Sequence, residues 1–277
     1  MLKFRLLIKD FLESAAAKFE IIYLTPTPAL TLKPRRLLVL DSSFNPPHLG
    51  HLALVQESLT HEYKGEKVPM NKPTSTTSND AASVLLLLSL ENADKGTTQL
   101  DAAIHRVDMM KITADYIQKV FQVDVNIGVI KAAKFVDKSL ILFNYLHARS
   151  VDHPKLTFLV GFDTLTRILD PKYYIPDKLS SSLQEFMLNC DLFVLTRGKG
   201  GVSQTKYVDD ISHGRIGEIP TQWSKSIHMI NENHGESELG VISSTLIRNE
   251  IMEGDEVWKS KVLPEIMQYI ETENLYK

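Results

Sequence analysis

The amino-acid sequence predicts an α/β protein built on a doubly wound parallel sheet with helices on both faces. Two observations support this fold class. Short, continuously apolar runs, typical of strands buried on both sides, alternate along the chain with longer segments typical of helices. Parallel strands need crossover connections, and the right-handed crossovers place helices on both faces of the sheet. In such folds, ligands bind at the carboxyl ends of the strands, where the strand order reverses.

The first 20 residues are amphipathic, and we expect them to form a helix that packs on the rest of the chain. Their acidic residues Asp10, Glu13 and Glu20 argue against a transit peptide, which is normally poor in acids. A proline-broken stretch at 25–34 then leads to the first strand, at 36–40. We therefore divide the chain into an N-terminal helix with its linker at 1–36 and one main domain at 37–277.

The remaining elements follow in alternation, with five further strands and seven helices. The strands are expected at 84–88, 123–130, 155–160, 192–195 and 226–230. The helices are expected at about 49–61, 99–121, 138–148, 164–169, 181–189, 244–252 and 263–273. Three segments rich in polar residues, glycine or proline are predicted as loops, at 67–80, 199–210 and 231–240.

Composition limits the classes of partner. The formal net charge of −3 gives no bulk electrostatic reason to expect a nucleic-acid or membrane-surface partner, so any anion site has to be built locally. No run approaches the roughly 18–20 apolar residues of a membrane span. The single cysteine, Cys190, lies in an apolar run and is interpreted as a small core side chain. One cysteine fits a reducing compartment, so we expect the cytoplasm or the nucleus, and a homo-oligomer stays open.

A polar segment at 42–51 follows the first strand, where a ligand site is expected. The helix that begins near His48 points its positive end at this turn, which favours anions. His48 and His51 lie on one face of its first turn and can donate hydrogen bonds to phosphate oxygens. Gly50 lets a base or a phosphate approach the helix closely. The alternatives are capping or core histidines, or a zinc pair, which would need a third ligand that no motif supplies.

A second segment, at 242–248, has a similar physical form. Ser243 or Ser244 is a natural N-cap and leaves free N–H groups at a helix start. Thr245 adds a hydroxyl, and Arg248, one turn further on, offers forked donors to the same phosphate. Alone, this segment could be no more than a well-capped helix. As a second anion cradle, it favours a triphosphate ligand.

Together, SFNPPHLGH at 43–51 and ISSTLIR at 242–248 resemble the signatures of the nicotinamide/nicotinic acid mononucleotide adenylyltransferases, and most of all a divergent fungal branch of them. This family belongs to the nucleotidylyltransferase superfamily, which has a Rossmann-like fold, and the resemblance begins near residue 37. It implies transfer of the adenylyl group of ATP to a pyridine mononucleotide, which forms NAD, or its deamido form, and pyrophosphate. It also implies Mg²⁺ bridging the ATP phosphates with mostly water ligands.

The resemblance also implies roles for individual residues. The implied catalytic residues are His48, His51 and Arg248. The implied ATP-binding residues are Ser43, Phe44, His48, His51, Gly161, Asp163, Ser243, Ser244, Thr245 and Arg248. The implied mononucleotide-binding residues are Ser43, Phe44, Lys95, Tyr173, Tyr174 and Arg197, and no metal-ligating side chain is implied. Asp163 would contact the adenosine ribose, although from its position alone it could equally cap the next helix.

Two positions depart from the family pattern. Ser42 stands where the family usually has glycine. The tryptophan that stacks on the nicotinamide ring after the third strand has no counterpart in 127–131, and Phe135 is the nearest aromatic residue. Two other functions therefore stay open. One is ATP hydrolysis or transfer to another phosphorylated acceptor, and the other is a non-enzymatic, ATP-binding regulatory or interaction role.

Overall fold

The computed structural model describes residues 2–25, 36–63, 66–67, 82–92, 96–97, 100–149, 151, 154–196, 201–230 and 238–277. Its main sheet has seven strands in the order β1-β8-β5-β2-β9-β10-β11. These are β1 (Phe19–Leu24), β2 (Arg36–Asp41), β5 (Ala82–Ser89), β8 (Asp124–Ile130), β9 (Lys155–Gly161), β10 (Cys190–Leu195) and β11 (Ile227–Ile230). Two short hairpins, β3 (Glu62–Tyr63) with β4 (Glu66–Lys67) and β6 (Glu91–Asn92) with β7 (Gly96–Thr97), lie outside this sheet.

All strands of the main sheet except β1 run parallel to their neighbours. Counted along the chain, the order of these parallel strands across the sheet is 3-2-1-4-5-6. The order reverses between β2 and β9, so the topological switch point lies at the carboxyl ends of these two strands. The predicted doubly wound parallel sheet is confirmed.

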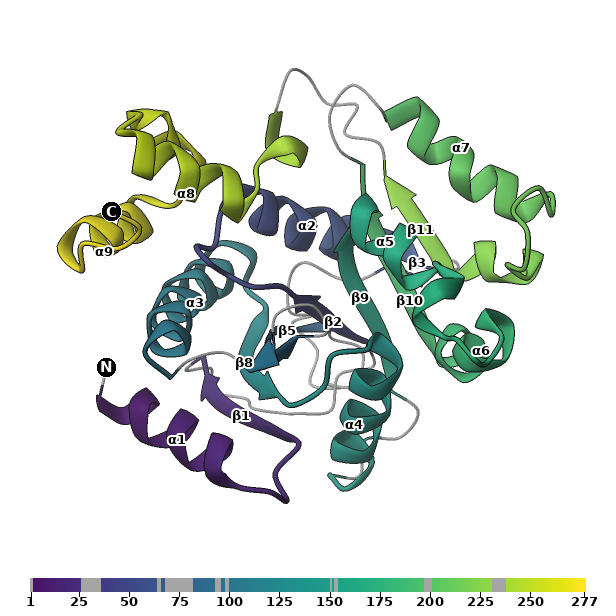
Figure 1. Ribbon diagram of the computed structural model, residues 1–277, viewed down its shortest axis with the longest axis horizontal. Coiled ribbons are helices and arrows are strands. Elements are labelled where there is room, and N and C mark those ends of the chain that lie inside the picture. The colour runs from purple at the N-terminus through teal and green to yellow at the C-terminus, as the bar shows by residue number, and fades with distance from the viewer. Residues whose placement is uncertain are drawn as a thin grey trace.

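Helices cover both faces of the sheet (Figure 1). They are α1 (Leu2–Glu13), α2 (Leu49–Thr60), α3 (Leu100–Phe121), α4 (Phe135–His147), α5 (Phe162–Ile168), α6 (Leu179–Asn189), α7 (Gly201–Ser212), α8 (Ser244–Glu253) and α9 (Pro264–Thr272). Successive strand residues point to opposite faces. Leu38 and Leu40 of β2 therefore join a core with α1, α2, α3, α8 and α9, whereas Leu37 and Val39 join a second core with α4, α5, α6 and α7.

The helix predicted over the first 20 residues is shorter than expected, because α1 ends at Glu13 and β1 follows it. β1 pairs antiparallel with β8 at the edge of the sheet. Gly128 in β8 makes room for it, since a Cβ atom there would lie 2.6 Å from the ring of Phe19. The division of the chain at residue 36 stays a prediction.

The predicted loop at 199–210 is wrong, because α7 spans Gly201–Ser212. Its polar composition and glycines conceal a one-sided apolar stripe. Ile211 is fully buried, and Tyr207 and Val208 pack against the same core. Lys206 and Asp210 add an ion pair of 2.6 Å between neighbouring turns of the exposed side. Most of the other two predicted loops, at 68–80 and 231–237, lies outside the described residues.

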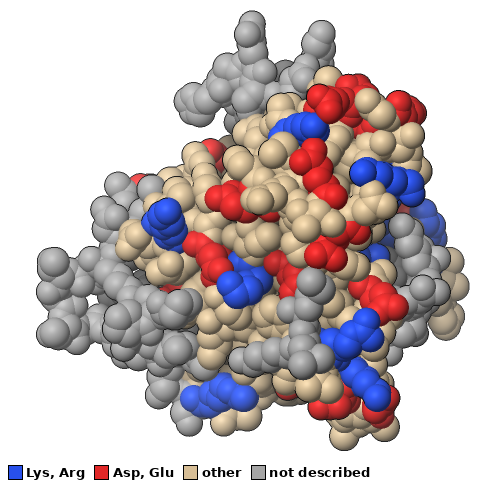
Figure 2. Space-filling model, turned by 90° about the vertical axis from the view of Figure 1, so that its left-hand side faces the viewer, with Lys and Arg blue, Asp and Glu red and all other residues tan. Residues whose placement is uncertain are grey.

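Charged side chains of both signs are interspersed on the face that carries α1, α3 and α9 (Figure 2). Several form pairs, such as Lys111 with Asp115 at 2.6 Å.

Cys190 is fully buried, as predicted for a core side chain, and burial raises the pKa of its thiol to about 12. In the part of the chain that the structure describes, no helix is both long enough and apolar enough to cross a membrane.

Candidate functional site

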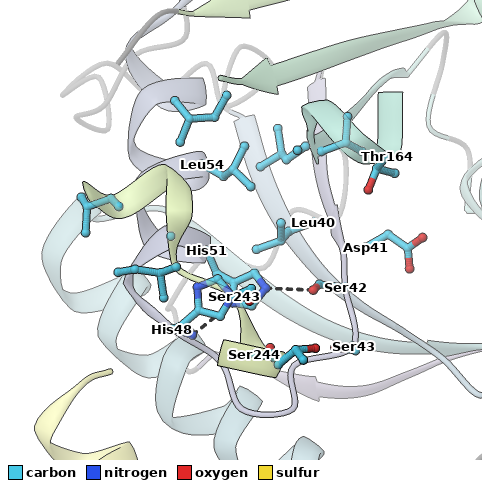
Figure 3. Close-up of a pocket in the computed structure, with 18 of the residues that line it drawn as sticks. Leu40, Asp41, Ser42, Ser43, His48, His51, Leu54, Thr164, Ser243 and Ser244 are labelled. Atoms are coloured by element: carbon cyan, nitrogen blue, oxygen red, sulfur yellow. Dashed lines mark hydrogen bonds between the residues drawn. The ribbon is translucent and has the colours of Figure 1, made fainter. Parts of the chain in front are cut away.

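A pocket of about 370 Å³ opens at the topological switch point (Figure 3). Its lining comes from the end of β2 and the turn after it, the first half of α2, and the ends of β9 and β10. Residues of α5 and of the segment that leads into α8 complete it. Its volume lies in the range of about 300–1,000 Å³ that is typical of small-molecule sites. The pocket therefore lies where this sheet topology predicts a ligand.

The turn between β2 and α2 is anchored in the protein core. Phe44 is fully buried and adopts a φ of 46°, which is uncommon for a bulky residue. Its ring packs against the ring of His51, with centroids 5.1 Å apart. Phe44 is thus part of the core and not of the pocket lining, so any contact with a nucleotide would be made by its backbone.

His48 and His51 both line the pocket. Their rings stack with centroids 3.7 Å apart, and only 8% and 5% of these residues is exposed. The backbone N–H of His48 donates to Nδ1 of His51 at 3.1 Å, so the histidines also take part in capping α2. A neutral His51 must therefore carry its proton on Nε2, which lies 2.8 Å from Oγ of Ser42.

The zinc alternative lacks ligands in the described ranges, where no group of three or more histidine, cysteine, aspartate or glutamate side chains could hold a metal ion.

Gly50 is also needed for packing within the protein, in addition to the predicted close approach of a ligand. A Cβ atom there would lie 2.9 Å from the carbonyl oxygen of Leu239 and 3.1 Å from the ring of His48. The space that this glycine leaves is therefore partly filled by the protein itself.

The second segment begins α8 at the same pocket. Ser243 is confirmed as its N-cap, because its hydroxyl accepts the N–H of Leu246 at 3.1 Å. Ser244 donates from Oγ to the carbonyl of Pro46 at 2.8 Å and so ties α8 to the β2–α2 turn. Two helices, α2 and α8, therefore direct their positive ends at one cavity, although their sequences are far apart.

Arg248 strengthens the junction between α8 and the turn. Its guanidinium donates to the carbonyl of Asn45 at 2.7 Å and to Oγ1 of Thr245 at 3.3 Å. Tyr276 donates to the side-chain oxygen of the same Asn45 at 2.8 Å. Burial raises the pKa of Tyr276, an effect that the nearby charges of Arg106 and Arg248 oppose. Arg248 thus lies just behind the pocket lining, held by the turn that it helps to fix.

A buried ion pair at the end of β2 is a feature that sequence reasoning missed. Lys138 of α4 donates to the carboxylate of Asp41, and the side chains are 5% and 7% exposed. Asp41 lines the pocket beside Ser42. The lysine neutralises a carboxylate that would otherwise repel an incoming phosphate. No local pattern connects these two residues, because they come from different crossover units.

Helix α5 contributes residues that the prediction overlooked. Thr164 and Arg167 line the pocket, whereas the predicted Asp163 is exposed in the first turn of the same helix and is not part of the lining. Gly161 lines the pocket as predicted, at the end of β9. The spacing of Thr164 and Arg167, three residues apart on one helix face, is the signal that could have identified them.

The predicted mononucleotide-binding residues lie further apart than the predicted ATP-binding residues, and few of those that the structure describes line the pocket. Ser43 lines the pocket, but Tyr173 and Tyr174 follow α5 outside its lining. Phe135 is half-buried at the start of α4 and is also absent from the lining. The other two predicted residues, Lys95 and Arg197, lie outside the described residues.

Comparison with known proteins gives both full-length similarity and a shared fold. No family model matches the chain. The chain is 33% identical over 272 residues, 97% of its length and 96% of the relative's, to a Schizosaccharomyces pombe protein named "Putative nicotinamide mononucleotide adenylyltransferase". Structures of Plasmodium falciparum nicotinic acid mononucleotide adenylyltransferase, complexed with NaAD and with APC, give TM-scores of 0.52 and 0.50. Each is 16% identical and aligns with 87% of this chain, and the alignments cover 97% and 96% of those chains, which shows a common fold.

Proposed function

The chain belongs to the nicotinamide mononucleotide adenylyltransferase family, and we propose that the pocket at the switch point is its active site. The enzyme transfers the adenylyl group of ATP to nicotinamide or nicotinate mononucleotide, and it forms NAD, or its deamido form, and pyrophosphate. One observation carries the assignment of the site. The two predicted phosphate-binding segments, which begin about 200 residues apart, join through the bond from Ser244 to Pro46 and line one cavity.

The reaction needs no side-chain nucleophile. An oxygen of the mononucleotide 5′-phosphate attacks the α-phosphorus of ATP and forms a new P–O bond. The bond from the α-phosphorus to the oxygen that bridges the α- and β-phosphates breaks, and its electron pair leaves with pyrophosphate. Negative charge is redistributed over the phosphate oxygens during this exchange, so catalysis consists of positioning and charge stabilisation.

The groups of the pocket suit these two tasks. We assign His48 and His51 to the α- and β-phosphates, since both line the pocket and the Nε2–H of His51 faces Ser42, whose residue also lines it. We assign Ser244 and Thr245 of the lining, Arg248 just behind it and the N-terminus of α8 to the β- and γ-phosphates. The guanidinium of Arg248 has five N–H donors, and its hydrogen bonds to Asn45 and Thr245 leave further donors for a phosphate.

The remaining assignments follow the family resemblance. Gly161 and Asp163 are assigned to the ATP ribose, because Gly161 lines the pocket and Asp163 lies in the first turn of the adjoining helix α5. The backbone of Ser43 and Phe44, together with Lys95, Tyr173, Tyr174 and Arg197, is assigned to the mononucleotide. These acceptor assignments rest on the sequence pattern. The buried Cys190 is consistent with the cytoplasm or the nucleus as the site of action.

We assign Mg²⁺ to the substrate as MgATP. The described lining contributes one carboxylate, Asp41, and Lys138 neutralises it. This donor set fits a cation held mainly by phosphate oxygens and water, which is the usual coordination of Mg²⁺ at nucleotide sites. The ion would offset phosphate charge, while the side chains of the pocket orient the two nucleotides.

The direct test supplies purified protein with ATP, Mg²⁺ and either nicotinamide or nicotinate mononucleotide, and separates the products by chromatography. We expect NAD, or its deamido form, together with an equal amount of pyrophosphate. ADP or AMP without a dinucleotide would contradict adenylyl transfer to these acceptors. Binding of ATP without any product would contradict an enzymatic role.

A variant of the central histidine tests the site itself. His51→Ala should lower kcat by about 10²- to 10³-fold, the usual cost of removing one preorganised donor. His213→Ala is the matched control, because its side chain is 54% exposed beyond α7 and outside the pocket. Thermal unfolding of both variants checks that the fold is retained. Full activity of a folded His51→Ala protein would refute the site assignment.

A further inference from the structure

Ser42 lies next to His51 in the lining of the pocket. Its Oγ lies 2.8 Å from Nε2 of His51, and the residue itself lines the cavity (Figure 3). Its backbone is held at the end of the sheet, where its N–H points at the carbonyl of Leu87 at 3.4 Å. The preceding Asp41 is fixed by its ion pair with Lys138. The hydroxyl is therefore mounted on a rigid support, one residue after the central strand.

Both nitrogens of His51 are already engaged. Nδ1 accepts the backbone N–H of His48 at 3.1 Å, and Nε2 faces the hydroxyl of Ser42. The ring is 5% exposed and lies between the rings of His48 and Phe44, at centroid distances of 3.7 and 5.1 Å. Close packing of this kind opposes the rotation that would direct Nε2 away from Ser42. Direct contact with a phosphate would require His51 to give up its bond to the serine.

The hydroxyl of Ser42 can link His51 to a phosphate in the pocket. A hydroxyl has one donor and two acceptor lone pairs, so Ser42 can accept the Nε2–H of His51 and donate its own hydrogen into the pocket. A hydroxyl that accepts from another donor becomes a stronger donor itself. Ser42 lines the same pocket as His48 and His51, the residues to which the α- and β-phosphates are assigned. Its hydrogen is thus available to a phosphate oxygen.

We propose that Ser42 is a catalytic residue whose hydroxyl donates to a non-bridging oxygen of the ATP α-phosphate while it accepts the Nε2–H of His51. This inference rests on the proposed adenylyl transfer. No proton is transferred along this relay, by which we mean the two linked hydrogen bonds from His51 to Ser42 and from Ser42 to the phosphate. As charge builds on the α-phosphate oxygen in the transition state, the two linked hydrogen bonds strengthen together, and His51 acts on the phosphate through the serine.

The first experiment compares kcat of Ser42→Ala and Ser42→Thr with wild type. Ser42→Ala should lose about 10²-fold in kcat, because one preorganised donor is removed, whereas Ser42→Thr keeps the hydroxyl and should retain most of the activity. Ser58→Ala is the matched control, since this buried serine of α2 donates to the carbonyl of Val55 and lies outside the pocket. A Ser42→Ala enzyme as active as wild type would overturn the proposal.

A second experiment asks which atom the serine contacts. In ATPαS one non-bridging α-oxygen is sulfur, a weaker hydrogen-bond acceptor, so one diastereomer should react more slowly than the other with wild-type enzyme. In Ser42→Ala this discrimination should shrink, because the donor that senses the substitution is gone. Unchanged discrimination would show that Ser42 does not contact the α-phosphate and would overturn the proposal.

A third measurement does not depend on turnover. The Nε2 proton of His51, observed by NMR, should remain protected when ATP binds to the wild-type protein, and it should lose protection in Ser42→Ala. Loss of this proton signal when ATP binds to the wild type would mean that the ring exchanges partners, and the relay would be wrong. Absence of dinucleotide formation by the wild type would instead refute the proposed function, while this measurement would still decide the relay.

Discussion

A buried network of charges lies at the end of the sheet opposite the pocket, and it makes a sharp prediction about stability. Asp191 near the start of β10 is fully buried and accepts from Arg36, the first residue of β2, at 2.7 Å. Lys155, the first residue of β9, lies 3.5 Å from its other oxygen, and His228 of β11 lies 3.7 Å away. Arg36 also donates to Oγ1 of Thr157 at 2.6 Å. Four neighbouring parallel strands are thus joined through one carboxylate.

The perturbation is Asp191→Asn, which keeps the shape and removes the charge. The Arg36 side chain is 7% exposed, so the variant removes the negative charge that this buried guanidinium contacts at 2.7 Å. Breaking one side of a buried ion pair costs about 3–5 kcal/mol. For a chain of this length, that loss corresponds to a decrease in Tm on the order of 10 °C. Activity should change little, because the network lies at the opposite end of the strands from the pocket.

The pKa of Asp191 determines how the stability difference between wild type and Asp191→Asn changes with pH. Burial alone would raise the pKa of Asp191, but the nearby imidazole of His228, the hydrogen bond from Arg36 and the charges of Lys155 and Arg36 outweigh it. The folded-state pKa therefore lies well below the ordinary value of about 3.9. A depressed pKa stabilises the fold above about pH 4, and this contribution is lost as pH falls towards the folded-state value. The difference between wild type and variant should be full at neutral pH and shrink in acid.

The assay is urea unfolding followed by circular dichroism, at about pH 7, where the contribution is full, and at about pH 3, where linkage predicts that it is partly lost. Asp209→Asn is the matched control. Its side chain is 54% exposed and pairs with Arg215 at 3.3 Å, so its loss should cost at most about 1 kcal/mol. The reasoning is refuted if Asp191→Asn is no more destabilising than Asp209→Asn, or if the difference from wild type grows in acid.

Three further predictions concern the site. Gly50→Ala places a Cβ atom 2.9 Å from the backbone oxygen of Leu239, so it should cost about 1–3 kcal/mol in urea unfolding and lower kcat/KM. Tyr276→Phe removes the 2.8 Å bond to Asn45 and should cost about 0.5–1.5 kcal/mol in the same assay. Arg248→Lys loses the forked donors, and a charge-assisted bond of about 1.5–3 kcal/mol implies at least roughly a tenfold loss in kcat/KM for ATP. Wild-type behaviour of any variant would contradict the corresponding contact.

The sequence predicts those parts of the molecule that are encoded locally. Continuous apolar runs identify the parallel strands, because both faces of each strand are buried. The turn before α2 and the cap of α8 are equally local, since proline, serine and histidine act within a few residues of their position. These signals place Ser43, His48, His51 and Ser243 at one pocket, because the carboxyl ends of parallel strands meet at one edge.

The features that escape prediction depend on partners distant in sequence. The residues around Asp191 predict a buried strand, but the local sequence does not indicate that Arg36, 155 residues away, neutralises the carboxylate. Lys138 is likewise indistinguishable from a solvated helix residue until α4 is seen to place it against Asp41. Edge strand β1 is half-exposed, so its apolar pattern is weaker than that of the central strands. A pattern within one segment cannot reveal a pairing between segments.

Buried cations neutralise a carboxylate at each end of the sheet, and the donors left at the pocket end explain how a chain of net charge −3 can bind a triphosphate. At the amino ends of the strands, Arg36 and Lys155 neutralise Asp191. At the carboxyl ends, Lys138 neutralises Asp41, and the polar groups that remain in the lining are backbone N–H groups, hydroxyls, imidazoles and the guanidinium of Arg167. In the described lining, the one carboxylate, Asp41, is already neutralised and does not compete with a phosphate for these donors. An incoming phosphate therefore meets oriented dipoles that need little rearrangement, the condition under which electrostatic stabilisation of a transition state is strongest.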